Sequence, residues 1–511
     1  MDKKALLTLL VILIPNCLSL AQSLRGEEAK RWQEALGLAQ SGKADQALAA
    51  FKNILERRPE PGLFIQAGNF LIRQGEAARA EELFIWGRRK LKQPRAFADR
   101  LADFYQSQQK YDRAVAEWCR LLPEQSDLVE SKLNEIAQYL GWSKAAALAE
   151  SAMEPEAGDQ GRSILVGLYL KAGDGQRAER IYTRIKDKKQ LNRAGQRFLN
   201  AGVRPETQAR VLEEYLSRTG YQEAEVMERL AAIYMGDKNY RKAAAVYDRL
   251  IMLSRPRALV LKARAELAQS RPQEAIEILA GLKEWKQGAG VDSLMVEARF
   301  ITAEARFILG EDGAALALWR SMAYDSILGL NYQCRASYRL GEHFLGAGEV
   351  DSALAYYRRT AKLGLAGELG NDALMRLLLI SESRSATIEG LKLFGRGLAD
   401  KNRAKLTAAA SWFAQVQREY PGTVLSDQAM LELSLMYQEA GEMERAVETW
   451  GRLASGAVDP LLACRAAYQQ GWLLKHRLNR PEKAAEIFKQ AILKYPDYSW
   501  SDLMRRELED K

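Results

Sequence analysis

Histidine is scarce in this 511-residue chain, and recognisable catalytic motifs are missing from it. The two histidines are His343 and His476, and neither lies beside a nucleophile motif of the Ser-His-Asp or Cys-His kind. The sequence also lacks a glycine-rich phosphate loop, a zinc signature and an HExxH pair. Scattered acidic residues are expected on solvated helix faces, so they do not indicate paired catalytic carboxylates. We therefore expect no enzymatic activity, no cofactor and no metal site.

Cysteine is also sparse, with four residues in the whole chain. Cys119, Cys334 and Cys464 each lie within a helical pattern and far from one another in sequence. Such a set is no disulfide framework, and no pair has the spacing of metal ligands. The prediction for these three is buried free thiols.

Long apolar runs are limited to the N-terminus, where two lysines precede an apolar stretch over residues 5–14. Small residues up to Ala21 then suit cleavage before Gln22, as in a secretory signal. The stretch is shorter than the roughly 20 residues of a membrane span, and Pro15 interrupts it. We expect residues 1–21 to be a signal peptide and the protein to be exported, to the periplasm or cell envelope.

Two alternatives for this N-terminus stay open. The segment could remain as an uncleaved anchor, or lipid on Cys17 could tether the chain to a membrane. Either would allow peripheral membrane or outer-membrane association. The remaining sequence has no second long apolar stretch, so we expect a soluble mature chain.

Positive charge slightly exceeds negative charge, giving a net charge of +9. Two basic runs, within residues 88–95 and 186–197, have the composition that binds phosphate groups. Acidic residues lie before and after each run, and export would remove the chain from most nucleic acid. We interpret the runs as solvated faces and helix C-termini, where cations are favoured, and expect no nucleic-acid partner.

What the chain does contain is a recurring Ala-x-x-x-aromatic pair. Several spacings approach one helical hairpin, such as 33 residues from Ala47 to Ala80 and 34 from there to Ala114. A period in this range indicates a stacked array whose units cannot bury their apolar faces alone. The pairs are Ala47/Phe51, Ala80/Phe84, Ala114/Trp118, Ala178/Tyr182, Ala243/Tyr247, Ala315/Trp319, Ala353/Tyr357, Ala408/Trp412, Ala446/Trp450 and Ala484/Phe488, with Ala275/Leu279 as a weaker member.

In the repeat unit around Ala353, each residue of the motif has a role in helix packing. Leu340 and Phe344 share one face of a first helix, and Gly348 can adopt the left-handed conformation that ends it. Ala353 then lets the second helix cross the first closely, and Tyr357 fills the seam one turn later.

This pattern resembles the tetratricopeptide repeat, which combines Leu-Gly and an aromatic on its first helix with Gly, Ala, an aromatic and a final Pro. The resemblance covers most of residues 28–498. Residues 413–423 and 488–498 look like helix endings of bacterial envelope repeats, including the outer-membrane barrel-assembly lipoprotein and the Tol-Pal-associated protein. Residues 124–158, 191–222 and about 366–405 match poorly, and the last stretch is expected to hide an irregular hairpin.

The resemblance implies an all-α, right-handed superhelical solenoid of helical hairpins, about ten to thirteen at a period near 34 residues. We expect an N-terminal solenoid over 22–290 and a C-terminal one over 291–511, with a bend near Gly288-Ala289-Gly290. In such arrays the first helices line a concave groove that binds a protein or peptide partner.

Carried over by position, the groove residues form one set whose side chains are not needed for packing. Asn69 followed by Arg73 resembles half of the clamp that holds a peptide carboxylate in some family members, although neighbouring units lack the remaining residues. The expected groove residues are Asn69, Arg73, Asp99, Asp103, Glu228, Arg335, Tyr338, Glu342 and His476.

The predicted function is therefore a non-catalytic scaffold or adaptor of the bacterial cell envelope. The alternative is an N-terminally anchored structural component of an outer-membrane assembly or secretion machine. A third interpretation, an enzyme acting on envelope polysaccharide, lacks any supporting motif.

Overall fold

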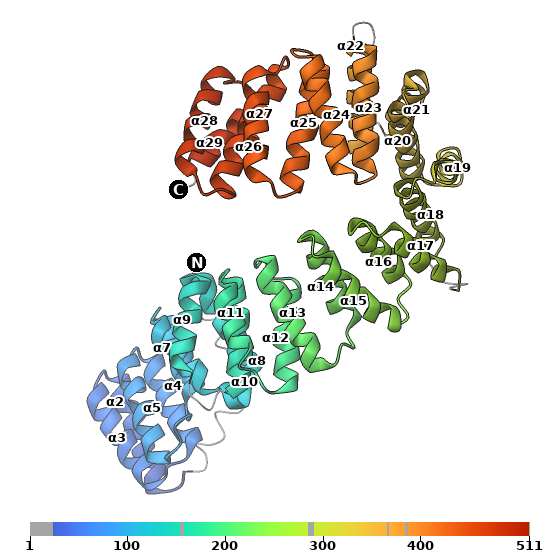
Figure 1. Cartoon of the computed structure of the whole chain (residues 1–511). Helices are drawn as coiled ribbons and strands as arrows, with labels where there is room; N and C mark the ends of the chain where they lie inside the picture. Colours follow the sequence, from blue (N-terminus) through green and yellow to red (C-terminus); the bar gives the residue numbers. More distant parts are fainter. Residues whose placement is uncertain (1–23, 154–157, 285–290, 365–366, 384–386, 510–511) are drawn as a thin grey trace. The chain divides into compact units, whose positions relative to one another are not determined.

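The structure is a computed structural model that describes residues 24–153, 158–284, 291–364, 367–383 and 387–509. All regular elements in these ranges are helices, and no strand occurs among them (Figure 1). The chain packs as two compact units, unit 1 up to Ile233 and unit 2 from Tyr234. The signal-peptide segment and the bend expected near residue 290 lie outside the described residues, so the domain boundary at 290 stays a prediction.

Unit 1 is built from helices that pair as antiparallel hairpins along the chain. Its helices are α2 (Glu27–Gln40), α3 (Ala44–Arg57), α4 (Pro61–Arg73), α5 (Ala77–Leu91), α6 (Ala98–Ser107), α7 (Tyr111–Arg120), α8 (Leu122–Leu140), α9 (Trp142–Ala152), α10 (Gly158–Lys171), α11 (Gly175–Tyr182), α12 (Lys188–Leu199), α13 (Pro205–Thr219) and α14 (Ala224–Gly236), whose last residues pass into unit 2.

Unit 2 continues the same architecture. Its elements are α15 (Tyr240–Met252), α16 (Arg257–Ala268), α17 (Pro272–Ala280), η3 (Gly281–Glu284), α18 (Val291–Ile308), α19 (Asp312–Ala323), α20 (Leu330–Gly346), α21 (Val350–Leu363), α22 (Glu368–Ser383), α23 (Ile388–Asn402), α24 (Leu406–Glu419), α25 (Val424–Glu439), α26 (Met443–Gly456), α27 (Pro460–His476), α28 (Pro481–Lys494) and α29 (Ser499–Glu509).

Local sequence explains where many helices begin. Proline occupies the first turn of α4, α13, α17, α27 and α28, where its missing N–H costs no helical hydrogen bond. The side chains of Asp174 and Asp187 accept hydrogen bonds from backbone N–H groups in the first turns of α11 and α12. No described helix combines the length and apolarity required to cross a bilayer.

The Ala/aromatic pairs predicted from the sequence lie on second helices and are buried, with one exception. Ala353 and Tyr357, for example, are fully inaccessible to solvent. The pair expected at Ala408 and Trp412 is wrong by one residue, because Ala408 is exposed and Trp412 is half-buried. Ala409 and Phe413 are the buried pair of α24. The all-helical stack of hairpins is thus confirmed within each unit.

Glycine on a first helix lets the aromatic of the second helix pack directly on the backbone. A Cβ atom added at Gly341 would lie 2.8 Å from the Tyr357 ring, and one at Gly397 would lie 2.6 Å from the Phe413 ring. Neither ring could stay in place beside a larger residue. The contact also identifies α23 and α24 as a regular hairpin.

Helix α22 is therefore an additional helix between the α20–α21 and α23–α24 hairpins, within the stretch 366–405 that matched the repeat poorly. It packs against α21 and also contacts α20, α23 and α25. Helix α23 packs on α20 so closely that a Cβ at Gly395 would lie 2.2 Å from the Leu345 carbonyl oxygen. Figure 1 shows α23 beside α20 and α22 rising next to α23.

The turn between the two helices of a hairpin repeatedly contains one left-handed residue. Its φ is +81° at Gly348 and +57° at Ala404, which is exposed. This conformation costs a residue with a Cβ atom about 1–2 kcal/mol. The residues at this position are Gly42, Gly75, Gln109, Gly173, Lys238, Ser270, Gly310, Gly348, Ala404, Gly441 and Asn479.

Exchanging glycine and alanine at two of these turns should change stability in opposite directions. We expect Ala404→Gly to raise the free energy of unfolding by about 0.5–1 kcal/mol and Gly348→Ala to lower it by about 1 kcal/mol. A Cβ at Gly348 would meet only Lys392 at 3.5 Å, an ordinary contact, so the effect there is conformational. Urea unfolding measures both, and a neutral Ala404→Gly would contradict the assignment of this turn.

Candidate functional site

The first helices of unit 1 form a surface connected by polar side chains. Glu130 of α8 accepts hydrogen bonds from Arg193 at 2.7 Å and Arg197 at 2.6 Å, both on α12. Gln106 of α6 donates to Glu135 of α8 at 2.8 Å. These bonds join helices that are not consecutive in sequence, so they hold the stack of first helices in one arrangement. We call this surface the unit 1 first-helix face.

Two of the predicted groove residues lie together on this face. Asp99 and Asp103 are one turn apart on α6, and their side chains are 48% and 56% exposed. Lys132 of α8 lies 3.7 Å from the Asp103 carboxylate. Partial burial and the neighbouring Asp99 raise the pKa of Asp103, while Lys132 opposes this rise. The result is an exposed acidic pair on a rigid helix.

The other predicted groove residues of unit 1 lie on different helices, α4 and α14. Arg73 is exposed at the end of α4, and its Nε donates to the carbonyl oxygen of the half-buried Asn69 at 3.3 Å. Glu228 is exposed on α14. The structure therefore gives Arg73 a local partner on its own helix.

In unit 2, three predicted groove residues lie on α20, and their side chains are less exposed than an open groove requires. Arg335 lies 3.0 Å from Glu297 and stacks 4.0 Å from the centre of the Phe300 ring. Glu342 is buried, with 5% of its surface exposed, and Tyr338 is half-buried against Tyr357. Burial of Tyr338 beside the Glu342 carboxylate raises the pKa of the phenol. These side chains already have partners within unit 2.

Glu342 belongs to a buried network that sequence reasoning missed. Its carboxylate accepts hydrogen bonds from Tyr357 at 2.7 Å and from Arg376 at 3.1 Å. Arg376 also donates to Glu432 at 3.2 Å, and Lys401 donates to Glu432 at 2.7 Å. These five residues, the Glu342 network, come from α20, α21, α22, α23 and α25. The network ties the additional helix to its neighbours.

A signal for two of these residues was present in the sequence. Arg376 is the only charged residue between Ala373 and Ile380, and Glu432 is the only one between Ala429 and Tyr437. A lone charge in an apolar helical run is buried when the run is buried, and a buried charge requires a partner of opposite sign. Their mutual pairing, 56 residues apart, had no local indication.

His476 is exposed at the end of α27 and lies beside the C-terminal helix. Its Nε2 is 2.9 Å from Glu507 of α29, and Lys475 is 3.0 Å from the same carboxylate. Burial raises the pKa of Glu507, but the hydrogen bonds from His476 and Lys475 outweigh it and hold that pKa below its ordinary value. His343 instead lines a cavity of about 100 Å³ with Trp319 and Asn402, and burial lowers its pKa.

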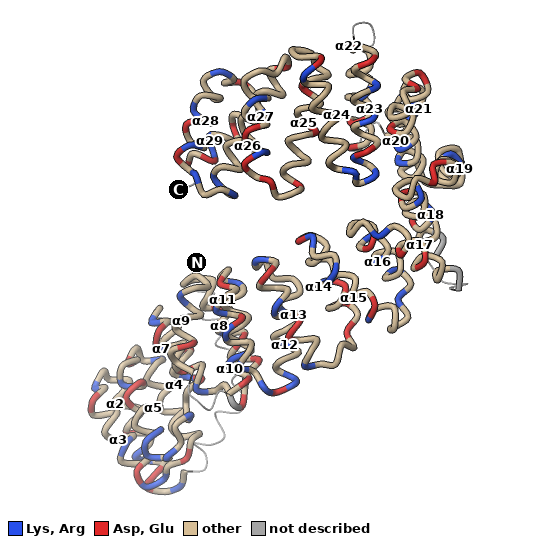
Figure 2. The backbone as a smooth tube through the Cα atoms, viewed as in Figure 1, with Lys and Arg blue, Asp and Glu red and all other residues tan. Residues whose placement is uncertain are grey.

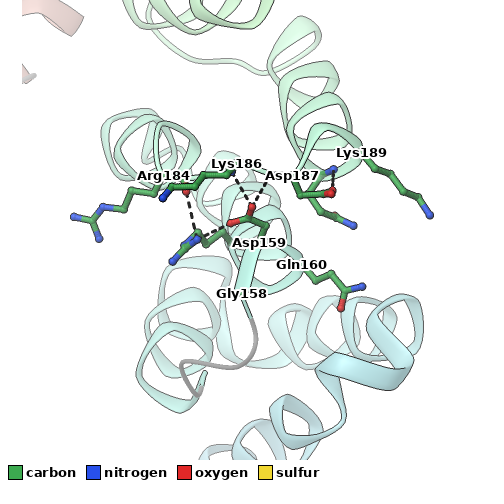
Figure 3. Close-up of a pocket in the computed structure, with 9 residues that line it drawn as sticks. Gly158, Asp159, Gln160, Arg184, Lys186, Asp187 and Lys189 are labelled. Atoms are coloured by element: carbon green, nitrogen blue, oxygen red, sulfur yellow. Dashed lines mark hydrogen bonds and ion pairs between the residues drawn. The ribbon is translucent and has the colours of Figure 1, made fainter. Parts of the chain in front are cut away.

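A hollow of about 850 Å³ lies in unit 1 at the start of α10 and α12. Asp159 accepts hydrogen bonds from the backbone N–H groups of Lys186 at 2.7 Å and Asp187 at 2.6 Å. Burial raises the pKa of Asp159, but these bonds hold it below its ordinary value. Figure 3 shows Arg184 and Lys189 pointing to opposite sides rather than toward one point. The charged side chains of the described residues that line the hollow thus do not converge on one point.

The two basic runs are partly accounted for by ion pairs. Arg88 forms two hydrogen bonds with Glu117, at 3.0 and 2.5 Å, and Arg95 lies 3.4 Å from Glu124. Arg193 of the second run binds Asp127 as well as Glu130. Figure 2 shows basic and acidic residues interspersed along the helices. The side chains of Arg88 and Glu117 are only 14% and 12% exposed, so this pair does not lie on the solvated face that we expected, whereas Arg193 is 37% exposed.

The three cysteines within the described residues are free and buried, as predicted. Burial raises the pKa of Cys119 to about 12, so its thiol stays protonated and unreactive near neutral pH. Among the described residues, no group of three or more His, Cys, Asp or Glu side chains is placed to hold a metal ion.

Comparison with known families agrees with the hairpin geometry. Sequence models of the tetratricopeptide repeat match residues 229–290, which include α15 to α17, and residues 465–498, which include α28. These two segments are similar to tetratricopeptide repeats. Together with the stacked hairpins, the matches support placing this chain in the tetratricopeptide repeat superfamily, whose members are typically non-catalytic scaffolds.

Solved structures that align with this chain do so weakly. The crystal structure of the yeast Tom70 aligns with a TM-score of 0.29 and 13% identity, over 95% of this chain and 99% of that chain. The apo form of the quorum sensor NprR from B. thuringiensis aligns with a TM-score of 0.33 and 13% identity, over 77% and 97%. Alignments at these scores carry no functional argument. No curated protein matches the sequence.

The pKa values of three carboxylates of unit 2, two of them buried and one half-buried, predict how its stability depends on pH. Burial raises the pKa of Glu297, Glu432 and Glu507, but hydrogen-bonded cations hold each below the ordinary value of 4.5. A depressed pKa contributes stability that is present above the unfolded-state value and lost as pH falls through the folded-state value.

We therefore expect the melting temperature of unit 2 to begin to fall below about pH 7, because the unfolded chain takes up a proton at His343 before the folded chain does, and to fall further below about pH 4.5 as the three carboxylates are protonated. Asp372 and Asp427, whose pKa values are raised by burial, offset part of the loss below about pH 4.5. Scanning calorimetry across this range is the measurement. In Glu432→Gln, the acid-induced part of the loss should be smaller than in the unmodified chain. A melting temperature that rises on acidification would contradict the direction of these shifts.

Proposed function

We propose that this chain is a non-catalytic scaffold that binds a polypeptide partner on the unit 1 first-helix face. The observation that carries the proposal is the exposed acidic pair of Asp99 and Asp103 on α6. An exposed hydrogen bond joins α6 to α8, and partly buried hydrogen bonds join α8 to α12. A surface that is already ordered loses little conformational entropy when a ligand binds, so its contacts contribute more fully to affinity. Tetratricopeptide segments elsewhere in the chain support the same class of function.

The chemistry of this face favours a partner segment with basic side chains. A third carboxylate on this face is that of Glu135 on α8, whose side chain is 46% exposed. Two cations of the chain lie nearby: Arg100 is 3.5 Å from Asp99 and 41% exposed, and Lys132 is 3.7 Å from Asp103 and 28% exposed. Carboxylates that are half in solvent can exchange water for a lysine or arginine of the partner with a modest desolvation cost.

Charge reversal tests this proposal. Asp103→Arg should reduce capture of the partner at least about tenfold in a cross-linking pull-down of the full chain from its native cells, because the reversed charge repels a basic segment. Asp112→Arg is the matched control, since Asp112 is exposed on α7, the second helix of the same hairpin. Equal capture by both variants would overturn the proposed face.

The location in the cell is a second part of the proposal. We infer export to the bacterial envelope from the basic, apolar and small-residue pattern of residues 1–21. N-terminal sequencing of the protein isolated from cell fractions tests it, and a mature chain that begins at Gln22 in the periplasmic fraction is the expected result. A chain beginning at Cys17 and labelled by a palmitate analogue would favour the anchored structural component. An intact N-terminus in the cytosol would exclude both.

A further inference from the structure

Helix α22 has two faces of opposite character. Its inner face carries Arg376, which joins the Glu342 network, together with the buried Ala373 and Ile380. Its outer face exposes Leu374 by 44%, Met375 by 55% and Leu378 by 54%. Positions i, i+1 and i+4 of a helix lie on one side, so the three side chains form one apolar stripe. Exposed large apolar residues grouped in this way mark interaction sites more often than single ones do.

The ends of the stripe are acidic. Glu368 precedes Met375 by seven residues and Glu382 follows Leu378 by four, so both lie on the same side of the helix as the stripe. Both are exposed, as is Asp372. Glu368 and Glu382 are 14 residues apart, about 21 Å along a helix. The only basic residue within α22, Arg376, is committed to the inner face.

We propose that this outer face of α22 docks an amphipathic helix of a partner protein, with apolar residues at its centre and lysine or arginine at both ends. Apolar side chains would cover Leu374, Met375 and Leu378, and the basic ends would meet Glu368 and Glu382. A second copy of this chain fits less well, because two α22 faces would bring acidic ends together. The proposal rests on the scaffold function, but it uses unit 2 and a helix that the repeat pattern does not supply.

The additional helix is suited to this task because its inner face is fixed. Arg376 binds Glu342 and Glu432, which lie on α20 and α25. The backbone that presents the stripe is therefore ordered before a partner arrives, and the partner helix alone has to be ordered on binding.

Fluorescence polarisation with two synthetic peptides tests the proposal. Both are helical, about four turns long, with a leucine stripe; one has lysines at both ends and the other has glutamates there. We expect the full chain to bind the lysine-ended peptide at least about tenfold more tightly than the glutamate-ended one. Leu378→Glu and, independently, Met375→Glu should weaken that binding at least about tenfold.

Leu493→Glu is the matched control, because Leu493 is 83% exposed on α28 and should not affect binding. Circular dichroism on each variant shows whether the fold is kept, and either stripe variant suffices if the other unfolds. Equal affinity for the two peptides, no binding of the lysine-ended peptide, or binding unchanged in both stripe variants would overturn the proposal. A dimer that Leu378→Glu dissociates would identify a second copy instead and would also overturn it.

The peptide-binding test of α22 is independent of the pull-down test of the unit 1 first-helix face. Asp103→Arg should leave binding of the lysine-ended peptide to α22 unchanged, and Leu378→Glu should leave the cross-link to the unit 1 face unchanged. A negative result with the Asp103 variant therefore does not contradict the α22 proposal, and a negative result with the stripe variants does not contradict the proposed unit 1 face.

Discussion

Arg376→Met is expected to lower the free energy of unfolding of unit 2 by about 3–5 kcal/mol. The side chain is 12% exposed and lies between the carboxylates of Glu342 and Glu432, which are 6% and 10% exposed. Methionine fills a similar volume but leaves Glu342 without its cation and Glu432 with Lys401 alone. A buried carboxylate without its cation pays a desolvation cost that is no longer compensated.

Hydrogen exchange of α20 to α25 measures the change locally, which is needed because the two units of this chain need not unfold together. A triple variant, Arg376→Met with Glu342→Gln and Glu432→Gln, should recover much of the loss, since it removes the buried charges along with their partner. Arg452→Met is the control, because Arg452 is 53% exposed, lies 4.0 Å from Glu448 and should change stability by less than about 0.5 kcal/mol. A loss in Arg376→Met no larger than in Arg452→Met would mean that the network does not stabilise unit 2.

The hairpins were predictable because their packing rule is local. Ala353 and Tyr357 are one turn apart on one helix, and the neighbouring Gly348 ends the previous helix, so sequence spacing contains the geometry. The error at Ala408 has the same origin. Residues 408–410 are all alanine and Trp412 precedes Phe413, so two registers satisfy the pattern. Contact with α23 selects Phe413, whose ring packs on Gly397, and that contact is outside the local pattern.

The exposure of the groove residues could not be predicted in the same way. Glu342 occupies a groove position of the repeat, yet Arg376 from α22 and Asn402 from α23 contact its carboxylate. Nothing near Glu342 in the sequence indicates that an additional helix follows one hairpin later. The side chains of Asp99 and Asp103 on α6 are 48% and 56% exposed. Binding by any of these residues stays a prediction.

Gly395→Ala is expected to lower the free energy of unfolding of unit 2 by about 2–4 kcal/mol, although it adds one methyl group. The new Cβ would lie 2.2 Å from the carbonyl oxygen of Leu345 and 2.7 Å from its carbonyl carbon. A side chain can rotate away from such a clash, but these atoms belong to the backbone of α20. Relief therefore requires α20 and α23 to move apart, which would loosen the packing of Ala399 against Gly346.

The matched control adds the same methyl group where there is room for it. Gly313 is exposed near the start of α19, has no atom within 4 Å of an added Cβ and has no left-handed backbone. Alanine is the better helix former by up to about 1 kcal/mol, so Gly313→Ala should leave unit 2 unchanged or slightly more stable. Urea unfolding of both variants then gives opposite signs for one chemical change. If Gly395→Ala is as stable as Gly313→Ala, helices α20 and α23 are not in backbone contact, and the placement of α22 beside them would have to be revised.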